Sequence, residues 1–262
     1  MIATQGLRCL YIATPPVVHM TLTHAAFDAG LAVLCEKPLT VDFAAGREAI
    51  ARIERERRPS AVNFSLASSP GLAMVCEVIK DGSIGTPLGV EIEASFTEWP
   101  RAWQSAAGTW LSERAEGGFT REVLSHFVFV LQRAFGKASV ERSTPNFPND
   151  GKNAERELRA QLKTGGLIVS VHGFVGGEEA DTNRFTLTGS NGAIEMHDWF
   201  GLRRRSGEDA WTPVRSPQEN REIGQAAQLD QLVALIEGRP HTLPSFAEAL
   251  AVQETIEAML RT

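Results

Sequence analysis

The chain has few cysteines and tyrosines and no long apolar run. Its 262 residues include one tyrosine, and the three cysteines, Cys9, Cys35 and Cys76, lie far apart in the sequence. This spacing gives neither a zinc-site pattern nor a disulfide framework, so no metal site is predicted. Reduced thiols are typical of a cytoplasmic protein, which is the location we expect. No apolar run approaches the length of a membrane span, and we expect no membrane partner.

Positive charge is also scarce. Lysine and arginine number 26 against 32 aspartates and glutamates, which gives a net charge of −6. A nucleic-acid-binding surface needs a basic face that neutralises phosphates, so nucleic acid is not an expected partner. The tight basic run at residues 203–205 (RRR) is better explained as a solvated strand or turn. The length suits one large domain or two smaller ones.

The first quarter of the chain has the pattern of parallel strands joined by helices. The apolar residues 7–13 and 31–35 are predicted to be buried strands, with a helix over 17–29 between them. Strand, helix and strand in this order form a parallel crossover unit, whose sheet is usually covered on both faces. A second helix over 42–57 and a third strand over 60–64 complete this part.

The rest of the chain has the pattern of a mainly antiparallel sheet with helices. Over residues 89–97, Val90, Ile92, Ala94 and Phe96 alternate with polar residues, as expected for a sheet with one face in water. Further strands are predicted over 156–163, 166–174, 184–188 and 193–198, with hairpin turns at 163–166 and 189–192, and helices over 71–80, 121–135, 220–237 and 245–261.

Polar residues follow two of the predicted parallel strands. Residues 12–16 (IATPP) and His19 follow the first strand, and residues 36–38 (EKP) follow the second. The carboxyl ends of parallel strands meet at one edge of a sheet, where ligands bind. A lone loop lysine is usually solvated, but Pro38 fixes the backbone here and Glu36 is expected beside the Lys37 ammonium. This pattern predicts a preorganised site.

Residues 116–127 (EGGFTREVLSHF) form a third polar cluster. Gly117 and Gly118 allow close approach of another backbone segment. Glu122 and His126 are four residues apart in a predicted helix, so they are expected to share a face, where a carboxylate can tune an imidazole. The simpler explanation is a surface pair of little energetic value, and the spacing alone favours it.

Taken in order, these motifs resemble one family, the Gfo/Idh/MocA oxidoreductases. The resemblance is carried by residues 13–19 (ATPPVVH), 36–38 (EKP), 82–85 (GSIG), Trp110 and 117–126 (GGFTREVLSH). It implies hydride transfer between NAD or NADP and a hydroxyl or carbonyl of a sugar, polyol or related small molecule. It also implies a homo-oligomer, a dimer or tetramer, that forms through the open sheet.

The same resemblance implies a fold class and two domains. The fold class is α/β plus α+β: a truncated Rossmann-like parallel α/β piece, followed by an α/β domain with a large, mainly antiparallel open sheet. Residues 1–63 would be the C-terminal remnant of an NAD(P)-binding domain. Residues 64–262 would be the domain that binds substrate and forms the oligomer.

Site residues also follow from the resemblance. Lys37 would contact the substrate and the nicotinamide ribose, and His126 would be the acid/base histidine. Glu122 stands where the family usually has aspartate, and it would complete the catalytic and substrate-binding set. The nicotinamide side of the cofactor would be lined by Thr14, Pro15, His19, Glu36 and Lys37, and the substrate pocket would be bordered by Trp110.

The sequence lacks the glycine-rich turn with which this family binds the cofactor pyrophosphate. No G-x-G-x-x-G occurs, and residues 82–89 (GSIGTPLG) have the wrong spacing and follow no strand. Without the turn, most of the cofactor affinity should be missing, and the parallel sheet should have an uncovered edge and an uncovered face. We favour a fragment of a longer dehydrogenase that can be inactive at this length. The alternative is a non-catalytic binding or assembly subunit that has lost dinucleotide binding.

The sequence also differs from the family pattern at two neighbouring positions, and other kinds of functional site are less well supported. Ser65 and Leu66 stand where many family members have an arginine and an aromatic residue. Ser125 precedes His126 directly and no G-x-S-x-G elbow occurs, so a hydrolase triad is not favoured. The strand histidines His172 and His197 are better explained as structural residues. For Trp99, Trp103 and Trp110, stacking on a sugar and anchoring the core stay equally open.

Overall fold

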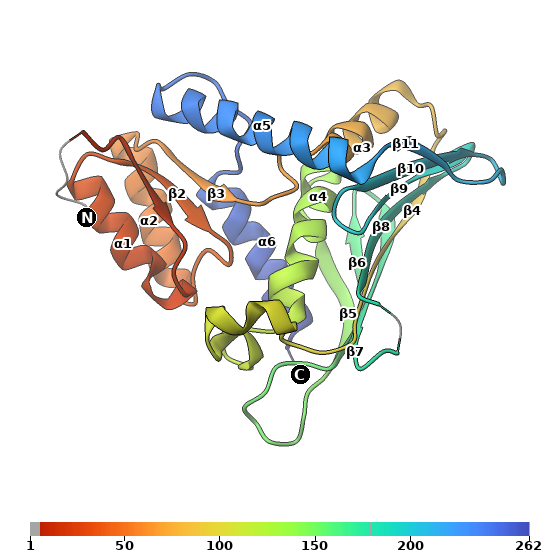
Figure 1. Cartoon of the computed structure of the whole chain (residues 1–262), viewed down its shortest axis with the longest axis horizontal. Coiled ribbons are helices and arrows are strands. Elements are labelled where there is room, and N and C mark those ends of the chain that lie inside the picture. Colours follow the sequence, from red (N-terminus) through yellow and green to blue (C-terminus); the bar gives the residue numbers. More distant parts are fainter. Residues whose placement is uncertain (1–5, 179, 262) are drawn as a thin grey trace.

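A small parallel sheet forms the first part of the structure (Figure 1). The computed structural model describes residues 6–178 and 180–261. Strands β1 (Cys9–Ile12), β2 (Ala32–Glu36) and β3 (Ser60–Asn63) lie in this order and pair in parallel. They are joined by the short 3-10 helix η1 (Pro16–Val18), α1 (His19–Asp28) and α2 (Phe43–Glu56). The predicted crossover unit is therefore confirmed.

The second face of this small sheet is covered, and the sequence expectation of an uncovered face is wrong. Helix α5 (Pro217–Ile236) crosses above it (Figure 1). Leu235 and Leu243 form a buried cluster with Leu34 of β2 and Ala61 of β3. The covering helix comes from the distant end of the sequence, which a local pattern cannot reveal. The edge at β1 is free among the described residues, because β1 pairs only with β2.

A larger sheet forms the second part. Within residues 6–178 and 180–261 it has eight strands in the order β11-β10-β9-β8-β4-β7-β6-β5. Neighbours are antiparallel except β4 and β7, which are parallel. The strands are β4 (Pro87–Phe96), β5 (Ser139–Asn146), β6 (Glu157–Thr164), β7 (Leu167–Val175), β8 (Thr182–Gly189), β9 (Gly192–His197), β10 (Gly201–Ser206) and β11 (Thr212–Arg215).

Strands β5 and β11 were missed in the sequence, and β10 was anticipated only as a solvated strand or turn over residues 203–205. They lie toward the two ends of the sheet and expose many of their residues, so the apolar alternation that marks a strand is weak. The basic residues 203–205 lie in β10, as the strand interpretation predicted. The predicted hairpins are confirmed, since β6 pairs with β7 and β8 with β9.

Helices cover one face of the large sheet and leave the other face open (Figure 1). The covering helices are α3 (Pro70–Asp81), α4 (Ser125–Phe135) and α6 (Phe246–Met259). The four apolar residues of β4 that the alternation singled out are 0–3% exposed in the core beneath these helices. The mixed α/β plus α+β architecture is therefore confirmed.

Helix α6 joins the two parts of the chain. The Gln253 side chain donates to the backbone carbonyl of Thr40 and accepts from the Thr40 N–H at 3.3 Å. A β-carbon on Gly46 of α2 would lie 3.2 Å from the Leu250 side chain, so the two helices pack closely there. The loop after β2, at the carboxyl edge of the small sheet, is thus held against α6.

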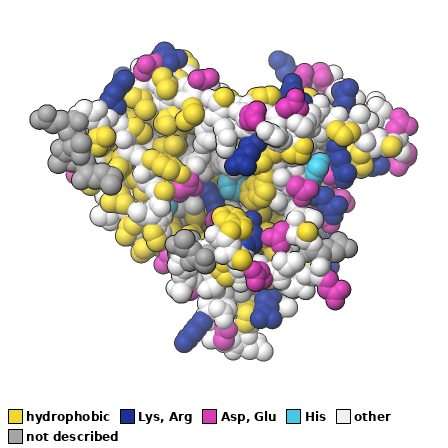
Figure 2. Space-filling view, viewed as in Figure 1, with side chains coloured by type: hydrophobic (Ala, Val, Ile, Leu, Met, Phe, Trp, Pro, Cys, Tyr) yellow, Lys and Arg dark blue, Asp and Glu magenta, His cyan; other side chains and the backbone are white. Residues whose placement is uncertain are grey.

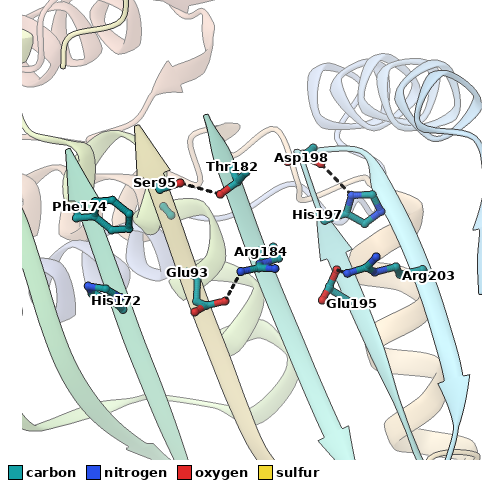
Figure 3. Close-up of a pocket in the computed structure, with 11 residues that line it drawn as sticks. Glu93, Ser95, His172, Phe174, Thr182, Arg184, Glu195, His197, Asp198 and Arg203 are labelled. Carbon is teal, nitrogen blue, oxygen red and sulfur yellow. Dashed lines mark hydrogen bonds and ion pairs between the residues drawn. The ribbon is translucent and has the colours of Figure 1, made fainter. Parts of the chain in front are cut away.

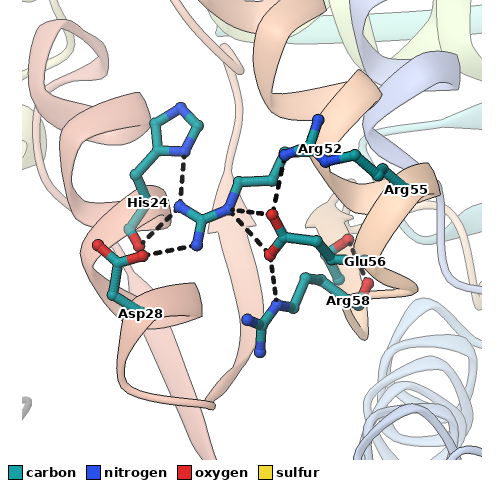
Figure 4. Close-up of polar contacts among 7 residues, drawn as sticks. His24, Asp28, Arg52, Arg55, Glu56 and Arg58 are labelled. Carbon is teal, nitrogen blue, oxygen red and sulfur yellow. Dashed lines mark hydrogen bonds and ion pairs between the residues drawn. The ribbon is translucent and has the colours of Figure 1, made fainter.

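Arg52 ties α1 to α2 through a network of polar contacts (Figure 4). Its Nη2 donates to Asp28 at 2.6 Å, and its Nε donates to Glu56 at 3.1 Å. Its Nη1 lies 3.2 Å from Nδ1 of His24. Hydrogen bonds from Arg58, and then from Arg52, lower the pKa of Glu56 to about 2. The network fixes the angle between the two helices that cover the small sheet.

We expect Glu56→Gln to lower the thermal midpoint at neutral pH and to have little effect in strong acid. A carboxyl group with a lowered folded-state pKa adds stability above its ordinary value of 4.5, and this stability is lost as the pH falls toward about 2. Thermal unfolding of both proteins at pH 7, 4 and 3 tests this. A deficit that stays constant over this range would contradict the assignment.

Candidate active site

Lys37 follows β2 and forms a buried ion pair. Its Nζ donates to the carboxylate of Glu122 and, at 2.9 Å, to the backbone carbonyl of Glu122. The side chains are 8% and 21% exposed. The expectation that Glu36 lies beside the ammonium is wrong, because the partner comes from 85 residues further along the chain. An ammonium with two fixed acceptors is held in place and retains a third donor.

Glu36 instead joins the carboxyl ends of the three parallel strands. Tyr11 of β1 donates its hydroxyl to the Glu36 carboxylate, and Asn63 of β3 donates its Nδ2 at 2.6 Å. Gln228 of α5 donates to Asn63 in turn. Burial, followed by the hydrogen bond to Glu36, raises the pKa of Tyr11 to about 12. These hydrogen-bonded residues could not be recognised in the sequence, because they are scattered over four elements.

The helix that carries Glu122 and His126 begins with a wide turn. Residues Thr120–Leu124 are π-helical and lead directly into α4. No hydrogen bond or ion pair joins Glu122 to His126 among the described residues, so the predicted surface pair is absent. The π turn changes the spacing on which that prediction depended. Glu122 contacts Lys37, and His126 has a separate environment.

His126 lies in an apolar environment beside the ion pair. It is 5% exposed, and its Nδ1 lies 3.4 Å from the Ser65 hydroxyl. The rings of Phe64 and Trp199 meet it edge to face at 5.6 and 5.3 Å. Burial, and then the charges of Lys37 and Arg101, lower the pKa of His126 well below its usual range. The imidazole is therefore neutral at neutral pH and can accept a proton.

Trp199 is a site residue that the sequence did not reveal. It lies between β9 and β10 with φ 69°, and the preceding Asp198 has φ 47°, both rare for side chains of their size. The Asn183 side chain accepts the Trp199 N–H at 2.9 Å, and the Asn183 carbonyl accepts the Asp198 N–H at 2.9 Å. The unusual backbone is thus held by hydrogen bonds, and it places the indole against His126.

The paired glycines before the π turn are required sterically. A β-carbon on Gly117 would lie 2.3 Å from the carbonyl oxygens of Trp110 and Leu111. Gly118 has φ +101°, and a β-carbon there would lie 2.2 Å from Glu155 Oε2. Glu155 is buried, and its Oε1 accepts the Thr120 N–H at 2.8 Å. The close approach that the sequence predicted is confirmed, and a buried carboxyl group caps the π turn that carries Glu122.

His19 links the loops that follow β1 and β2 at the carboxyl edge of the small sheet. Its Nε2 lies 2.8 Å from the carbonyl of Thr14, and its Nδ1 lies 3.2 Å from the carbonyl of Leu39. The imidazole is fully buried, whereas Thr14 and Pro15 are exposed. The loops after β1 and β2 are therefore held together, with Thr14 and Pro15 available at the surface.

The three tryptophans differ in their surroundings. Trp99 packs on Phe96 and Phe119 and donates its indole N–H to the Leu111 carbonyl at 2.9 Å, so it anchors the core. Trp103 is 72% exposed. Trp110 is half-buried, and within the described parts of the chain no hydrogen bond or ring contact joins it to Lys37, Glu122 or His126. Its place at the substrate pocket stays a prediction.

The residues around Lys37 lie between the carboxyl end of β2 and the π turn that leads into α4. In the space-filling view, histidine and basic side chains gather in the hollow between the small-sheet part and the large-sheet part (Figure 2). In residues 6–178 and 180–261, no cluster of three histidine, cysteine or acidic side chains could hold a metal ion. No helix in the same residues is long and apolar enough to cross a membrane.

Two family profiles match nearly the whole chain. Residues 1–64 match an oxidoreductase family with an NAD-binding Rossmann fold, and residues 76–262 match the C-terminal alpha/beta domain of the same family. The chain belongs to the Gfo/Idh/MocA family. The resemblance inferred from the ordered motifs is thereby confirmed.

Curated relatives include two named dehydrogenases. D-Apiose dehydrogenase of Paraburkholderia graminis is 33% identical over 87 residues, which are 33% of this chain and 23% of that protein. Inositol 2-dehydrogenase 4 of Saccharopolyspora erythraea is 27% identical over 176 residues, which are 67% of this chain and 50% of that protein. The match thus spans half or less of each of these relatives.

Solved structures share the fold over the full length of the chain. An oxidoreductase from Thermotoga maritima superimposes with a TM-score of 0.81 at 19% identity, covering 99% of this chain and 78% of that one. Levoglucosan dehydrogenase in complex with NADH and L-sorbose gives a TM-score of 0.79 at 18% identity, with the same coverage of both chains. At these identities the likeness shows the fold.

Proposed function

We propose that this chain carries the catalytic residues of an NAD(P)-dependent dehydrogenase or reductase that acts on a CH–OH group of a sugar, polyol or related compound. The proposal rests on one observation: Glu122, which pairs with Lys37, and the buried His126 lie on consecutive helical segments, and the Lys37 charge helps to lower the pKa of the imidazole. Relatives and neighbours named as apiose, inositol and levoglucosan dehydrogenases support the substrate class.

The residues of the site suit the removal of a proton and a hydride from the same substrate. A neutral His126 accepts the hydroxyl proton, and the Lys37 ammonium stabilises the negative charge that develops on the oxygen. Glu122 keeps the ammonium in place. Bound NAD(P) supplies the hydride acceptor. Phe64 and Trp199 exclude water from the imidazole, which strengthens these electrostatic effects.

The exposed loop after β1 fits the nicotinamide end of the cofactor. Thr14 and Pro15 lie at the carboxyl edge of the parallel strands, and His19 holds this loop to the one that follows Lys37. We propose Thr14, Pro15, Glu36 and Lys37 as cofactor contacts, with His19 as their support. The choice between NAD and NADP stays open in this proposal.

The open face of the large sheet is the surface we propose for a dimer or tetramer. It bears paired charges around a hollow of about 470 Å³ (Figure 3). The pairs are Glu93 with Arg184 at 2.9 Å, Glu195 with Arg203 at 2.6 Å, His172 with Glu157 at 3.2 Å and His197 with Asp198 at 3.1 Å. Each histidine has a carboxylate partner, as the structural interpretation predicted. Sedimentation of the purified chain measures the oligomeric state.

A non-catalytic assembly subunit is the second candidate, because the sequence has no G-x-G-x-x-G turn. Fluorescence titration with NADH and NADPH separates the two. The proposed dehydrogenase binds at least one of them at millimolar concentration or below, with a change in tryptophan emission. A chain that binds neither would support the assembly subunit.

The cytoplasmic location, which the free thiols of the chain favour, is part of the same proposal.

We expect the rate of alcohol oxidation to be nearly independent of pH between about 6.5 and 8. The pKa of His126 is lowered well below 6.5 by burial and by the Lys37 and Arg101 charges, so its basic form persists in this range. The pH profile of kcat/KM tests this. A fall in rate with an apparent pKa near 6.5 that disappears in His126→Asn would contradict a buried neutral base.

A further inference from the structure

Arg101 lies in the loop after β4 and is surrounded by aromatic rings. Its guanidinium carbon lies 4.6 Å from the ring centre of Trp103, 5.3 Å from that of Trp99 and 5.7 Å from that of Phe96. Its Nε donates to the Gln104 side chain at 3.0 Å. The rings and the amide hold the planar group in one orientation.

This guanidinium has no carboxylate partner among residues 6–178 and 180–261. Its Nε and its backbone N–H both donate to Gln104, and among the side chains that the structure describes the two terminal nitrogens have no acceptor. By contrast, Arg52, Arg121 and Arg203 each have a carboxylate oxygen at 2.6 Å. Arg101 is half-buried, and the carboxylates that act on its charge, Glu122 and Asp181, form no ion pair with it, so its removal from water is only partly compensated.

The unpaired cation belongs to the surroundings of the catalytic residues. Trp99 and Phe96, which stack on Arg101, both contact Phe119, the residue before the π turn. The charge of Arg101 acts on Glu122 and also contributes to the lowered pKa of His126. A group bound to the terminal nitrogens of Arg101 would therefore belong to the molecule that reacts at His126.

We propose that Arg101 binds a carboxylate of the substrate, so that the preferred substrates are hydroxy acids of the sugar or polyol type. A planar guanidinium with two free terminal nitrogens matches the two oxygens of a carboxylate. The aromatic rings beside it cover the carbon chain of the substrate. This inference rests on the proposed function, because it names the substrate class of the same site.

Calorimetric titration of the full chain with three six-carbon probes tests the proposal. The probes are D-gluconate, the neutral polyol D-glucitol and D-glucose 6-phosphate. We expect gluconate to bind about 10-fold or more tightly than glucitol, the size of effect that a charge-assisted hydrogen-bonded pair supplies. Tighter binding of the phosphate would overturn the assignment to a carboxylate. Equal binding of gluconate and glucitol, or no binding of any probe, would overturn the site.

Three variants locate the effect. Arg101→Met should remove the preference for gluconate, and Arg101→Lys should keep part of it, since the charge remains. Arg114→Met is the matched control, because Arg114 is also half-buried and stacks on a ring, that of Phe147 at 3.9 Å, in another part of the molecule. A gluconate preference that persists in Arg101→Met overturns the proposal.

The test separates this inference from the proposed function. A chain that prefers gluconate through Arg101 but reduces no cofactor would overturn the dehydrogenase and leave the anion site. A chain that oxidises glucitol as fast as gluconate, at equal KM, would leave the dehydrogenase and overturn the role of Arg101.

Discussion

Replacing Lys37 with methionine should lower kcat for hydride transfer by about 10²–10³-fold, the usual effect of removing one preorganised donor from a developing oxyanion. Lys37 is 8% exposed on its side chain and is already held by two acceptors of Glu122. Its remaining donor therefore needs no reorganisation when charge develops on the substrate oxygen. Steady-state kinetics of the purified variant measure the loss.

Two comparisons show whether the lost activity is chemical. Lys37→Met leaves Glu122 without its partner, so stability should also fall, by up to about 3 kcal/mol. The double variant Lys37→Met/Glu122→Gln should recover that stability without recovering activity. Lys137→Met is the control, because Lys137 is 75% exposed and lies 3.9 Å from its nearest carboxylate. A Lys37→Met enzyme with unchanged kcat would remove Lys37 from the mechanism.

Replacing Gly118 with alanine should destabilise the protein by about 3 kcal/mol or more and abolish activity, because two costs add at this position. The backbone has φ +101°, which L-residues rarely adopt, and the new methyl group would lie 2.2 Å from the buried Glu155 carboxylate. Moving Glu155 away would release the Thr120 N–H at the start of the helical segment that carries Glu122 and His126. Thermal unfolding and turnover measure the two effects.

Gly136→Ala separates the backbone cost from the steric cost. Gly136 has φ +86° and ψ −175°, a region almost restricted to glycine, with no atom within 4 Å of the new methyl group, so this change should carry the backbone cost alone, about 1–3 kcal/mol. Adding Glu155→Ala to Gly118→Ala should recover part of the stability, since the clash is removed. Equal costs at Gly118 and Gly136 would show that Glu155 does not restrain the helix.

Local patterns predicted most of the architecture. Apolar runs and alternation predicted the parallel strands and β4, and the helix predicted from residue 42 is α2, which Asp42 caps by accepting the Ala44 N–H at 2.8 Å. These features depend on residues that are close in the sequence. The edge strands β5 and β11 were missed because their exposed residues carry little apolar pattern.

The contacts of the site could not be predicted from spacing. The sequence placed Lys37, Glu122 and His126 near one another only through family resemblance, and the pairings it suggested were wrong. Lys37 pairs with Glu122 rather than with Glu36, and a π turn separates Glu122 from His126. Trp199 contacts His126 from the loop after β9, and the charge of Arg101, in the loop after β4, acts on its pKa, although both residues are distant in the sequence. Such contacts depend on tertiary packing, which periodicity does not encode.

The most direct test of the account is the appearance of reduced cofactor at 340 nm. The purified chain is incubated with millimolar NAD or NADP and a panel of polyols, sugars and sugar acids, with His126→Asn as the matched control. We expect at least one substrate to yield NADH or NADPH, and His126→Asn to reduce that rate about 10²-fold or more. A folded chain that reduces neither cofactor with any substrate, or an unchanged rate in His126→Asn, would contradict the account.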